Sequence, residues 1–235
     1  MIQVFGHKAP DTDSTGSPII WAWYLSDIRK QPAKAVLLGE PNTEAAWMLT
    51  KWDLPKPAII ADVAAGDKCV IVDTNNPAEL PPSINEADVI EIIDHHLLAG
   101  GIKTRLPINI TMRPLACTAT ILHDLIGDED LARAPKGVKG AMLTCILSDT
   151  LEFRSPTTTP HDRFVAEKLA RNPAMGEKQL ARLEKGRPAA ELLEVIEKQH
   201  ALPLYFENAL VACCRRAHDT DENLEAGVML ENLAS

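Results

Sequence analysis

The sequence predicts an α/β protein built on a doubly wound parallel sheet. Short apolar runs alternate with helical patterns as far as about residue 125, as expected when a crossover helix follows each strand. The apolar runs are rich in Val and Ile and lack polar alternation, which is typical of strands covered on both faces. After Gly127 the pattern is helical, so we expect a smaller, mainly helical C-terminal segment after the sheet.

The elements follow one another in a regular order along the chain. Strands are expected at 2–5, 35–38, 58–61, 70–72 and 89–93. Helices are expected at 14–29, 43–52, 116–126, 137–147, 161–170, 177–184 and 189–199, and one or two further strands at 202–206 and 209–214. Gly186 and Pro188 interrupt the helical pattern, which places a boundary between a first domain, 1–185, and a second, 186–235.

Composition limits the classes of function. The 235-residue chain is long enough to bury a core, and its formal net charge of −9 without basic clusters argues against nucleic acid or a membrane surface as partner. No apolar stretch approaches the roughly 20 residues that span a bilayer, and the N-terminus lacks a signal-peptide pattern. We therefore expect a cytoplasmic protein. Five cysteines without a Cys-x-x-Cys pair predict buried, reduced thiols rather than a zinc site.

Acidic and imidazole side chains gather where three predicted strands end. His7, Asp11 and Asp13 follow the first strand, Asp73 follows the run Cys69-Val-Ile-Val, and Asp94-His95-His96 closes a third. The carboxyl ends of parallel strands share one edge of the sheet, so these groups are expected to converge. A mixture of carboxylates and imidazoles suits a divalent metal ion.

Each acid also has a simpler interpretation. An isolated Asp73 at a strand end is more often a helix or turn cap than a metal ligand, and Asp11 or Asp13 can cap the helix that follows. Asp149 differs, because it closes an apolar helix whose C-terminal dipole disfavours a negative charge. A nearby cation would remove that penalty, which is an independent reason to regard Asp149 as a ligand.

The adjacent histidines have two interpretations as well. Within a strand, His95 and His96 would point to opposite faces, one toward the core and one toward the surface. At the end of a strand this alternation relaxes, so that both can face one site. Asp94 is then expected to support a neighbouring histidine instead of binding metal itself.

Four ordered motifs resemble those of the DHH phosphoesterases. They are Gly-His7-Lys-Ala-Pro-Asp11-Thr-Asp13-Ser14, Val72-Asp73-Thr-Asn, Asp94-His95-His96 and Leu147-Ser148-Asp149-Thr150. Within that superfamily, Pro-Asp-Thr-Asp-Ser and the Ser-Asp-Thr-Leu-x-Phe-x-Ser-Pro-Thr-Thr-Thr stretch at 148–159 are similar to the manganese-dependent, family II inorganic pyrophosphatases. The resemblance covers roughly residues 1–170, and four motifs in order are more specific than any one alone.

The resemblance implies a reaction and a metal centre. The reaction is hydrolysis of inorganic pyrophosphate, a small-molecule substrate, to two phosphates by a hydroxide that two metal ions activate. The ions would be Mn²⁺, with Co²⁺ as a substitute and Mg²⁺ arriving with the substrate. The implied ligands are His7 and Asp11 for one ion, Asp13, His95 and Asp149 for the other, and Asp73 as a bridge. His96 would be the catalytic and substrate-binding histidine, and the family implies a homodimer.

The second half of the chain departs from the family pattern. Full-length members carry a second domain whose Lys and Ser-Arg-Lys-Lys-Gln motif neutralise pyrophosphate, and this sequence lacks that motif. Leu97 also stands where many relatives have Lys. The basic residues placed to substitute are Arg187, Lys198, Arg215 and Arg216, although ordinary surface charges are the simpler interpretation. The substrate clamp is therefore rebuilt, supplied by another chain, or missing.

Two other functions stay open at this point. One is a DHH-type phosphodiesterase or exopolyphosphatase that acts on oligonucleotides, cyclic dinucleotides or polyphosphate. The glycine-rich C-terminal motif typical of those relatives is not evident in this sequence. The other is a truncated, non-catalytic paralogue that binds metal and phosphate.

Overall fold

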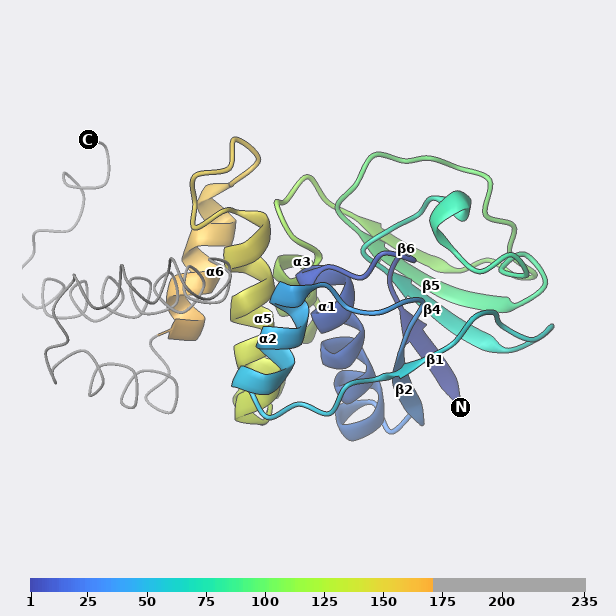
Figure 1. Cartoon of the computed structure of the whole chain (residues 1–235), viewed down its shortest axis with the longest axis horizontal. Coiled ribbons are helices and arrows are strands. Elements are labelled where there is room, and N and C mark those ends of the chain that lie inside the picture. Colours follow the sequence, from blue (N-terminus) through green and yellow to red (C-terminus); the bar gives the residue numbers. More distant parts are fainter. Residues whose placement is uncertain (171–235) are drawn as a thin grey trace, which may run out of the picture.

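The computed structural model describes residues 1–170, which form a six-stranded parallel sheet with helices packed on one face (Figure 1). The strands are β1 (Ile2–Phe5), β2 (Ala33–Leu37), β3 (Ala58–Ile59), β4 (Lys68–Val72), β5 (Asp88–Asp94) and β6 (Asn109–Met112). They lie in the order β3-β2-β1-β4-β5-β6, and each pairing is parallel. This is the order of a doubly wound sheet, in which the winding direction reverses between β1 and β4. The predicted fold class is confirmed.

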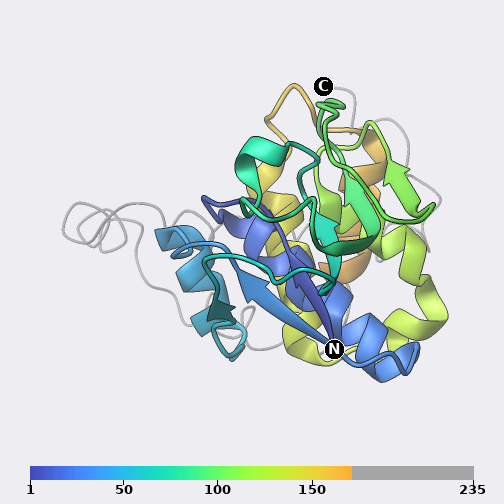
Figure 2. The same ribbon diagram turned by 90° about the vertical axis from the view of Figure 1, so that its right-hand side faces the viewer.

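The helices pack in successive layers on one side of the sheet. They are α1 (Thr12–Trp23), α2 (Thr43–Lys51), α3 (Thr118–Ile126), α4 (Asp128–Ala132), α5 (Lys136–Asp149) and α6 (Pro160–Ala170), with a π-helical turn η1 (Tyr24–Ile28) and a 3-10 turn η2 (Pro77–Glu79). Helices α1 and α3 contact the strands, α5 packs on α1 and α3, and α6 packs on α5. Figure 2 shows the strands and their connecting loops in front of these helices.

Both faces of the central strands are buried. On β4, Val70 and Val72 belong to the core beneath the helices, whereas Ile71 belongs to a second core on the opposite face. Leu80 and Ile84, which follow η2, cover that second face together with neighbouring loops. Burial on both sides explains why the β4 sequence lacks polar alternation.

Several boundaries differ from the sequence-based expectation. The strand at 58–61 has only the two residues of β3, and both are exposed because β3 is the edge strand, so the expected burial on both faces is wrong there. Strand β6 and helix α4 are not among the predicted elements. In the case of β6, the segment begins with Asn109 and has no continuous apolar run. The helix expected at 14–29 begins at Thr12 and changes to the π-helical turn η1 after Trp23.

The start of α6 shows why the threonine-rich stretch before it forms a loop. Thr159 donates its backbone N–H to Asp162 Oδ2 at 2.9 Å, and the Asp162 N–H donates back to Thr159 Oγ1 at 3.2 Å. This reciprocal pair is a capping box, with Pro160 at the first helical position. Thr159 therefore has a structural role at the helix start.

Burial confirms the prediction for the cysteines that the structure describes. Cys69, Cys117 and Cys145 are buried and free, and burial raises the pKa of the Cys69 thiol to about 12. Within residues 1–170, no helix combines the length and apolar character needed to cross a bilayer. The domain boundary at 185/186, the elements expected after residue 170, and Cys213 and Cys214 lie outside the described residues. The cytoplasmic location stays a prediction.

Candidate metal centre

The candidate residues converge at the carboxyl-terminal edge of the sheet. They comprise His7, Asp11 and Asp13 after β1, Asp73 after β4, His95 and His96 after β5, and Asp149 as the last residue of α5. This edge borders the switch point between β1 and β4, where open α/β sheets bind their ligands.

A first group of potential ligands consists of His7, Asp11 and Asp73. His7 Nε2 lies 3.5 Å from Asp11 Oδ2 and 3.5 Å from Asp73 Oδ2. The other oxygen of Asp11, Oδ1, accepts the Ser14 N–H at 2.9 Å and so caps α1. The capping and ligand interpretations of Asp11 are therefore compatible, because each uses a different oxygen.

A second group consists of Asp13, His95 and Asp149, whose candidate ligand atoms all lie within 4.8 Å of one another. His95 Nδ1 lies 3.1 Å from the carbonyl oxygen of Leu115, which leaves Nε2 to face the site. Asp149 Oδ2 is buried without a hydrogen-bond partner among the residues that the structure describes. An unpaired buried carboxylate oxygen is costly, and a cation at this position would satisfy it.

Asp73 connects the two groups. Its Oδ2 faces His7, while its Oδ1 lies 3.3 Å from His95 Nε2. The backbone of Asp73 has φ 60°, and its N–H donates to the Ile93 carbonyl at 2.9 Å. Thr118 Oγ1 donates to Asp73 Oδ1 at 3.2 Å. The carboxylate is thus buried and oriented toward both groups.

The electrostatics of the cluster favour bound cations. Burial raises the pKa of Asp73 well above its usual range, and the negative charges of Asp13 and Asp11 add to the effect. Burial likewise raises the pKa of Asp149, with further contributions from Asp13 and Asp73. Divalent cations would compensate these crowded charges, and a carboxylate-rich set with imidazoles suits Mn²⁺ better than Zn²⁺.

His96 has a different environment from His95. The two rings lie side by side with centroids 4.2 Å apart, so both face the site, as the strand-end interpretation predicts. His96 Nδ1 lies 2.9 Å from Asp94 Oδ1, while about half of the side chain is exposed. The hydrogen bond that His96 donates to the Asp94 carboxylate raises the pKa of His96. Asp94 thus supports His96, whereas the Leu115 carbonyl orients His95.

Close contacts fix the segment that carries the first ligands. A Cβ on Gly6 would lie 2.0 Å from Ser14 Oγ, so the strand end and the start of α1 can approach this closely only with glycine. The His7 N–H donates to the same Ser14 Oγ at 2.7 Å. The glycine before His7 therefore allows the turn that directs His7 toward the sheet edge.

Two residues that orient the site have no role predicted from the sequence. Thr118 begins α3 and donates its N–H to Asp13 Oδ2 at 2.6 Å, in addition to its contact with Asp73. Asn75 donates to Asp94 Oδ2 at 2.5 Å. Asn75 lies within a recognisable motif and could have been considered, whereas no spacing signal places Thr118 near the metal ligands.

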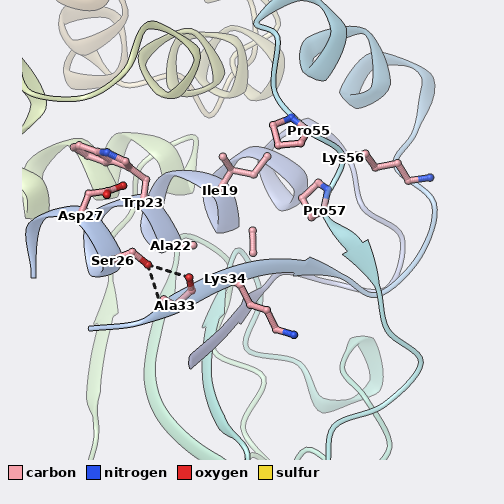
Figure 3. Close-up of a pocket in the computed structure, with 11 residues that line it drawn as sticks. Ile19, Ala22, Trp23, Ser26, Asp27, Ala33, Lys34, Pro55, Lys56 and Pro57 are labelled. Carbon is pink, nitrogen blue, oxygen red and sulfur yellow. Dashed lines mark hydrogen bonds between the residues drawn. The ribbon is translucent and has the colours of Figure 1, made fainter. Parts of the chain in front are cut away.

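A pocket of about 340 Å³ lies away from this centre, between α1, η1, β2 and residues 55–57 (Figure 3). Trp23, Ser26 and Lys34 line it, together with Pro55 and Pro57. It contains none of the candidate metal ligands and adjoins the amino-terminal half of β2. The pocket is therefore separate from the candidate metal centre.

The family of the chain follows from a comparison with family models. The model of the DHH family, N-terminal domain, matches residues 1–148. The chain belongs to the DHH family.

Comparison with curated proteins identifies named relatives of this chain. The chain is 41% identical over 170 residues, 72% of its length and 53% of the relative's, to the "Probable manganese-dependent inorganic pyrophosphatase" of Deinococcus radiodurans. It is 35% identical over 207 residues, 85% of its length and 66% of the relative's, to the protein of that name from Lactobacillus helveticus. The chain spans about half the length of the first curated relatives it matches.

Solved structures agree with the fold. A Methanococcus jannaschii protein provisionally assigned to the family II inorganic pyrophosphatases matches with a TM-score of 0.65 at 32% identity, covering 78% of this chain and 60% of that one. An exopolyphosphatase-related protein from Bacteroides fragilis matches with a TM-score of 0.58 at 16% identity, covering 85% and 56%. The second likeness shows the fold alone.

The predicted substitutes for a substrate clamp, Arg187, Lys198, Arg215 and Arg216, lie outside the described residues. Leu97, which follows His96, is solvent-exposed. Ligation by the converging residues stays a prediction.

Proposed function

We propose that this chain hydrolyses inorganic pyrophosphate to two phosphates in a manganese-dependent reaction. The observation that carries the proposal is the pair of ligand groups that meet at the buried Asp73. Relatives that are named manganese-dependent inorganic pyrophosphatases support the choice of metal and substrate.

The residues present fit two divalent ions. His7 and Asp11 would hold one ion, Asp13, His95 and Asp149 the other, and Asp73 would bridge them. Two bound Mn²⁺ ions would supply Lewis acidity toward phosphoryl oxygens and lower the pKa of a coordinated water. A cation would also satisfy Asp149 Oδ2, which is buried and has no hydrogen-bond partner among the described residues.

The protein side chains contribute positioning and a proton. Asp94 holds His96 Nδ1, which leaves Nε2 to donate to a phosphate oxygen or to the leaving group. Thr118 orients Asp13 and Asp73 through its N–H and hydroxyl, so the two carboxylates need not reorganise during the reaction.

The test incubates the Mn²⁺-loaded chain, with Mg²⁺ present, with pyrophosphate, polyphosphate and a short oligonucleotide in parallel. Release of inorganic phosphate is measured for the first two substrates, and release of mononucleotides for the oligonucleotide. The proposal predicts that pyrophosphate is the preferred substrate. Preferential hydrolysis of polyphosphate or the oligonucleotide would instead identify an exopolyphosphatase or a phosphodiesterase. Metal binding without any hydrolysis would identify a non-catalytic protein. The homodimer is also a proposal, which sedimentation equilibrium of the same preparation tests.

A further inference from the structure

Asp94 is a buried carboxylate whose two oxygens have different partners. Its Oδ1 accepts the N–H groups of His95 and His96 at 2.8 and 3.1 Å and lies 2.9 Å from His96 Nδ1. Its Oδ2 accepts a hydrogen bond from Asn75 Nδ2 at 2.5 Å. The plane of the carboxylate is therefore fixed by His95 and His96 at one oxygen and by Asn75 at the other.

Asn75 also holds the loop that follows His96. Its Nδ2 donates to the Leu97 carbonyl at 2.9 Å, and its Oδ1 accepts the Ala99 N–H at 2.6 Å. A primary amide has two N–H donors, so one can serve Asp94 and the other Leu97. The buried Asn75 amide thus joins the Asp94 carboxylate and the loop 97–99 in one network.

A second asparagine makes the same kind of contact farther along this loop. Asn85 Oδ1 accepts the Lys103 N–H at 2.7 Å, and its Nδ2 donates to the Gly101 carbonyl at 3.5 Å. Each asparagine therefore bonds a carbonyl and the N–H two residues later. Asn75 differs from Asn85 in that it is buried and also contacts Asp94, so Asn85 provides a control for the loop contacts.

We propose that Asn75 is a positioning residue, which fixes Asp94 so that Asp94 directs the His96 ring toward the substrate. The inference rests on the proposed function, because it assigns His96 a role in pyrophosphate hydrolysis. Removal of Asn75 frees the Asp94 carboxylate to rotate and releases the Leu97 carbonyl. The His95 ring keeps its contact with the Leu115 carbonyl, and no other proposed metal ligand is bonded to Asn75 or Asp94, so we expect metal binding to be retained.

The kinetic test compares Asn75→Ala with Asn85→Ala. Outer hydrogen-bond partners at such sites typically contribute roughly 10–100-fold, so kcat of Asn75→Ala should fall by that factor. Its KM and its Mn²⁺ content should stay within about threefold of the parent, because substrate and metal contacts remain. Asn85→Ala should leave kcat unchanged. Equal effects of the two variants, or a loss of Mn²⁺ from Asn75→Ala, would overturn the inference.

A double-mutant cycle tests whether Asn75 acts through His96. In a His96→Gln background, Asn75→Ala should cause no further loss of kcat, because the group that Asn75 positions is already absent. Multiplied losses in the double variant would show that Asn75 acts elsewhere, which overturns the proposal.

A spectroscopic measurement separates this inference from the proposed function. In the diamagnetic, Mg²⁺-loaded protein labelled with ¹⁵N-histidine, the His96 Nδ1 resonance should shift in Asn75→Ala and stay in place in Asn85→Ala. If Asn75→Ala shows this shift but the parent releases no phosphate from pyrophosphate, the positioning role stands and the proposed function is overturned. If the parent releases phosphate but the His96 resonance is unchanged in Asn75→Ala, the proposed function stands and the positioning role is overturned.

Folding of the variants is checked by circular dichroism. If Asn75→Ala does not fold, Asn75→Ser replaces it in each experiment with the same expected results. A serine has a single side-chain polar atom, so it cannot replace both the donor to Asp94 and the acceptor for Ala99 at their present positions.

Discussion

Asp73 shows at the scale of a single residue how backbone and charge act together. Its φ of 60° lies in the left-handed region, which Asp and Asn tolerate better than most residues. This conformation directs the carboxylate between His7 and His95. Asparagine can therefore replace Asp73 without new backbone strain while removing the negative charge.

We expect Asp73→Asn to keep the fold and lose tight binding of a metal pair. An amide cannot supply the bridging charge for two divalent cations, although it retains size and conformational preference. Elemental analysis after Mn²⁺ loading and desalting should give no more than about one ion per chain. The metal-free variant should unfold at a temperature no lower than the parent, because the substitution removes a buried carboxylate that other acids crowd. Normal metal content in Asp73→Asn would refute the bridged pair.

His96→Gln should separate catalysis from metal binding. Loss of a positioned proton donor typically lowers turnover by about 10²–10⁴-fold, so kcat should fall in this range. The six proposed ligands are untouched, and the Mn²⁺ content should remain that of the parent. Steady-state kinetics and elemental analysis of one preparation check both points. Loss of metal would mean that the roles of His95 and His96 are reversed.

At the scale of elements, the contact between α1 and α5 brings the acids of the second ligand group together. Asp13 lies in the first turn of α1, and Asp149 ends α5. Gly16 is the point of close approach, because a Cβ on it would lie 2.3 Å from Cys145 Sγ. The spacing of these two helices therefore depends on a missing side chain at residue 16.

Gly16→Ala should destabilise the protein by about 1–3 kcal/mol, the usual effect of overpacking a buried contact. Urea unfolding of the metal-free protein measures this change. The same substitution in a Cys145→Ala background should cost less than half as much, because the clashing sulfur is gone. An equal cost in both backgrounds would show that the helices are not limited by this contact.

The sequence predicts an element well where its side chains follow one regular pattern, such as a continuous apolar run. Val70 and Ile71 lie in an apolar run whose burial on both faces matches β4. By contrast, residues 151–153 all have positive φ although none is glycine, and no residue preference indicates such a turn. The turn is held by longer-range contacts, for example the Thr158 hydroxyl on the Thr150 carbonyl at 3.3 Å.

At the scale of the whole molecule, the parallel sheet explains why distant motifs could be placed at one site. Each strand delivers the residues after its carboxyl end to the same edge, so His7, Asp73 and His95 were expected to converge. Thr118 could not be foreseen, because it approaches from a helix start whose position depends on how α3 packs. Packing of that kind is a property of the assembled fold and leaves no local pattern.

The absence of Ser-Arg-Lys-Lys-Gln from the 235 residues bears on substrate handling. Phosphoryl transfer depends on cationic groups that bind the substrate and stabilise developing charge. We expect this chain alone to show weaker affinity for pyrophosphate, and turnover roughly 10²-fold below the Deinococcus radiodurans relative at saturating Mn²⁺ and Mg²⁺. Equal activity would instead make Arg187, Lys198, Arg215 and Arg216 the first alanine targets.

The central claim is that residues that follow three strands, together with one residue each from α1 and α5, hold a pair of divalent ions. The most direct measurement is the Mn²⁺ content of the purified chain after Mn²⁺ loading and desalting, determined by elemental analysis against protein concentration. One ligand group contains Asp73, and the other adjoins Asp73 Oδ1 through His95, so about two ions per chain are predicted. A content near zero would contradict the claim, because the buried carboxylates would then have to exist without the cations that compensate their charge.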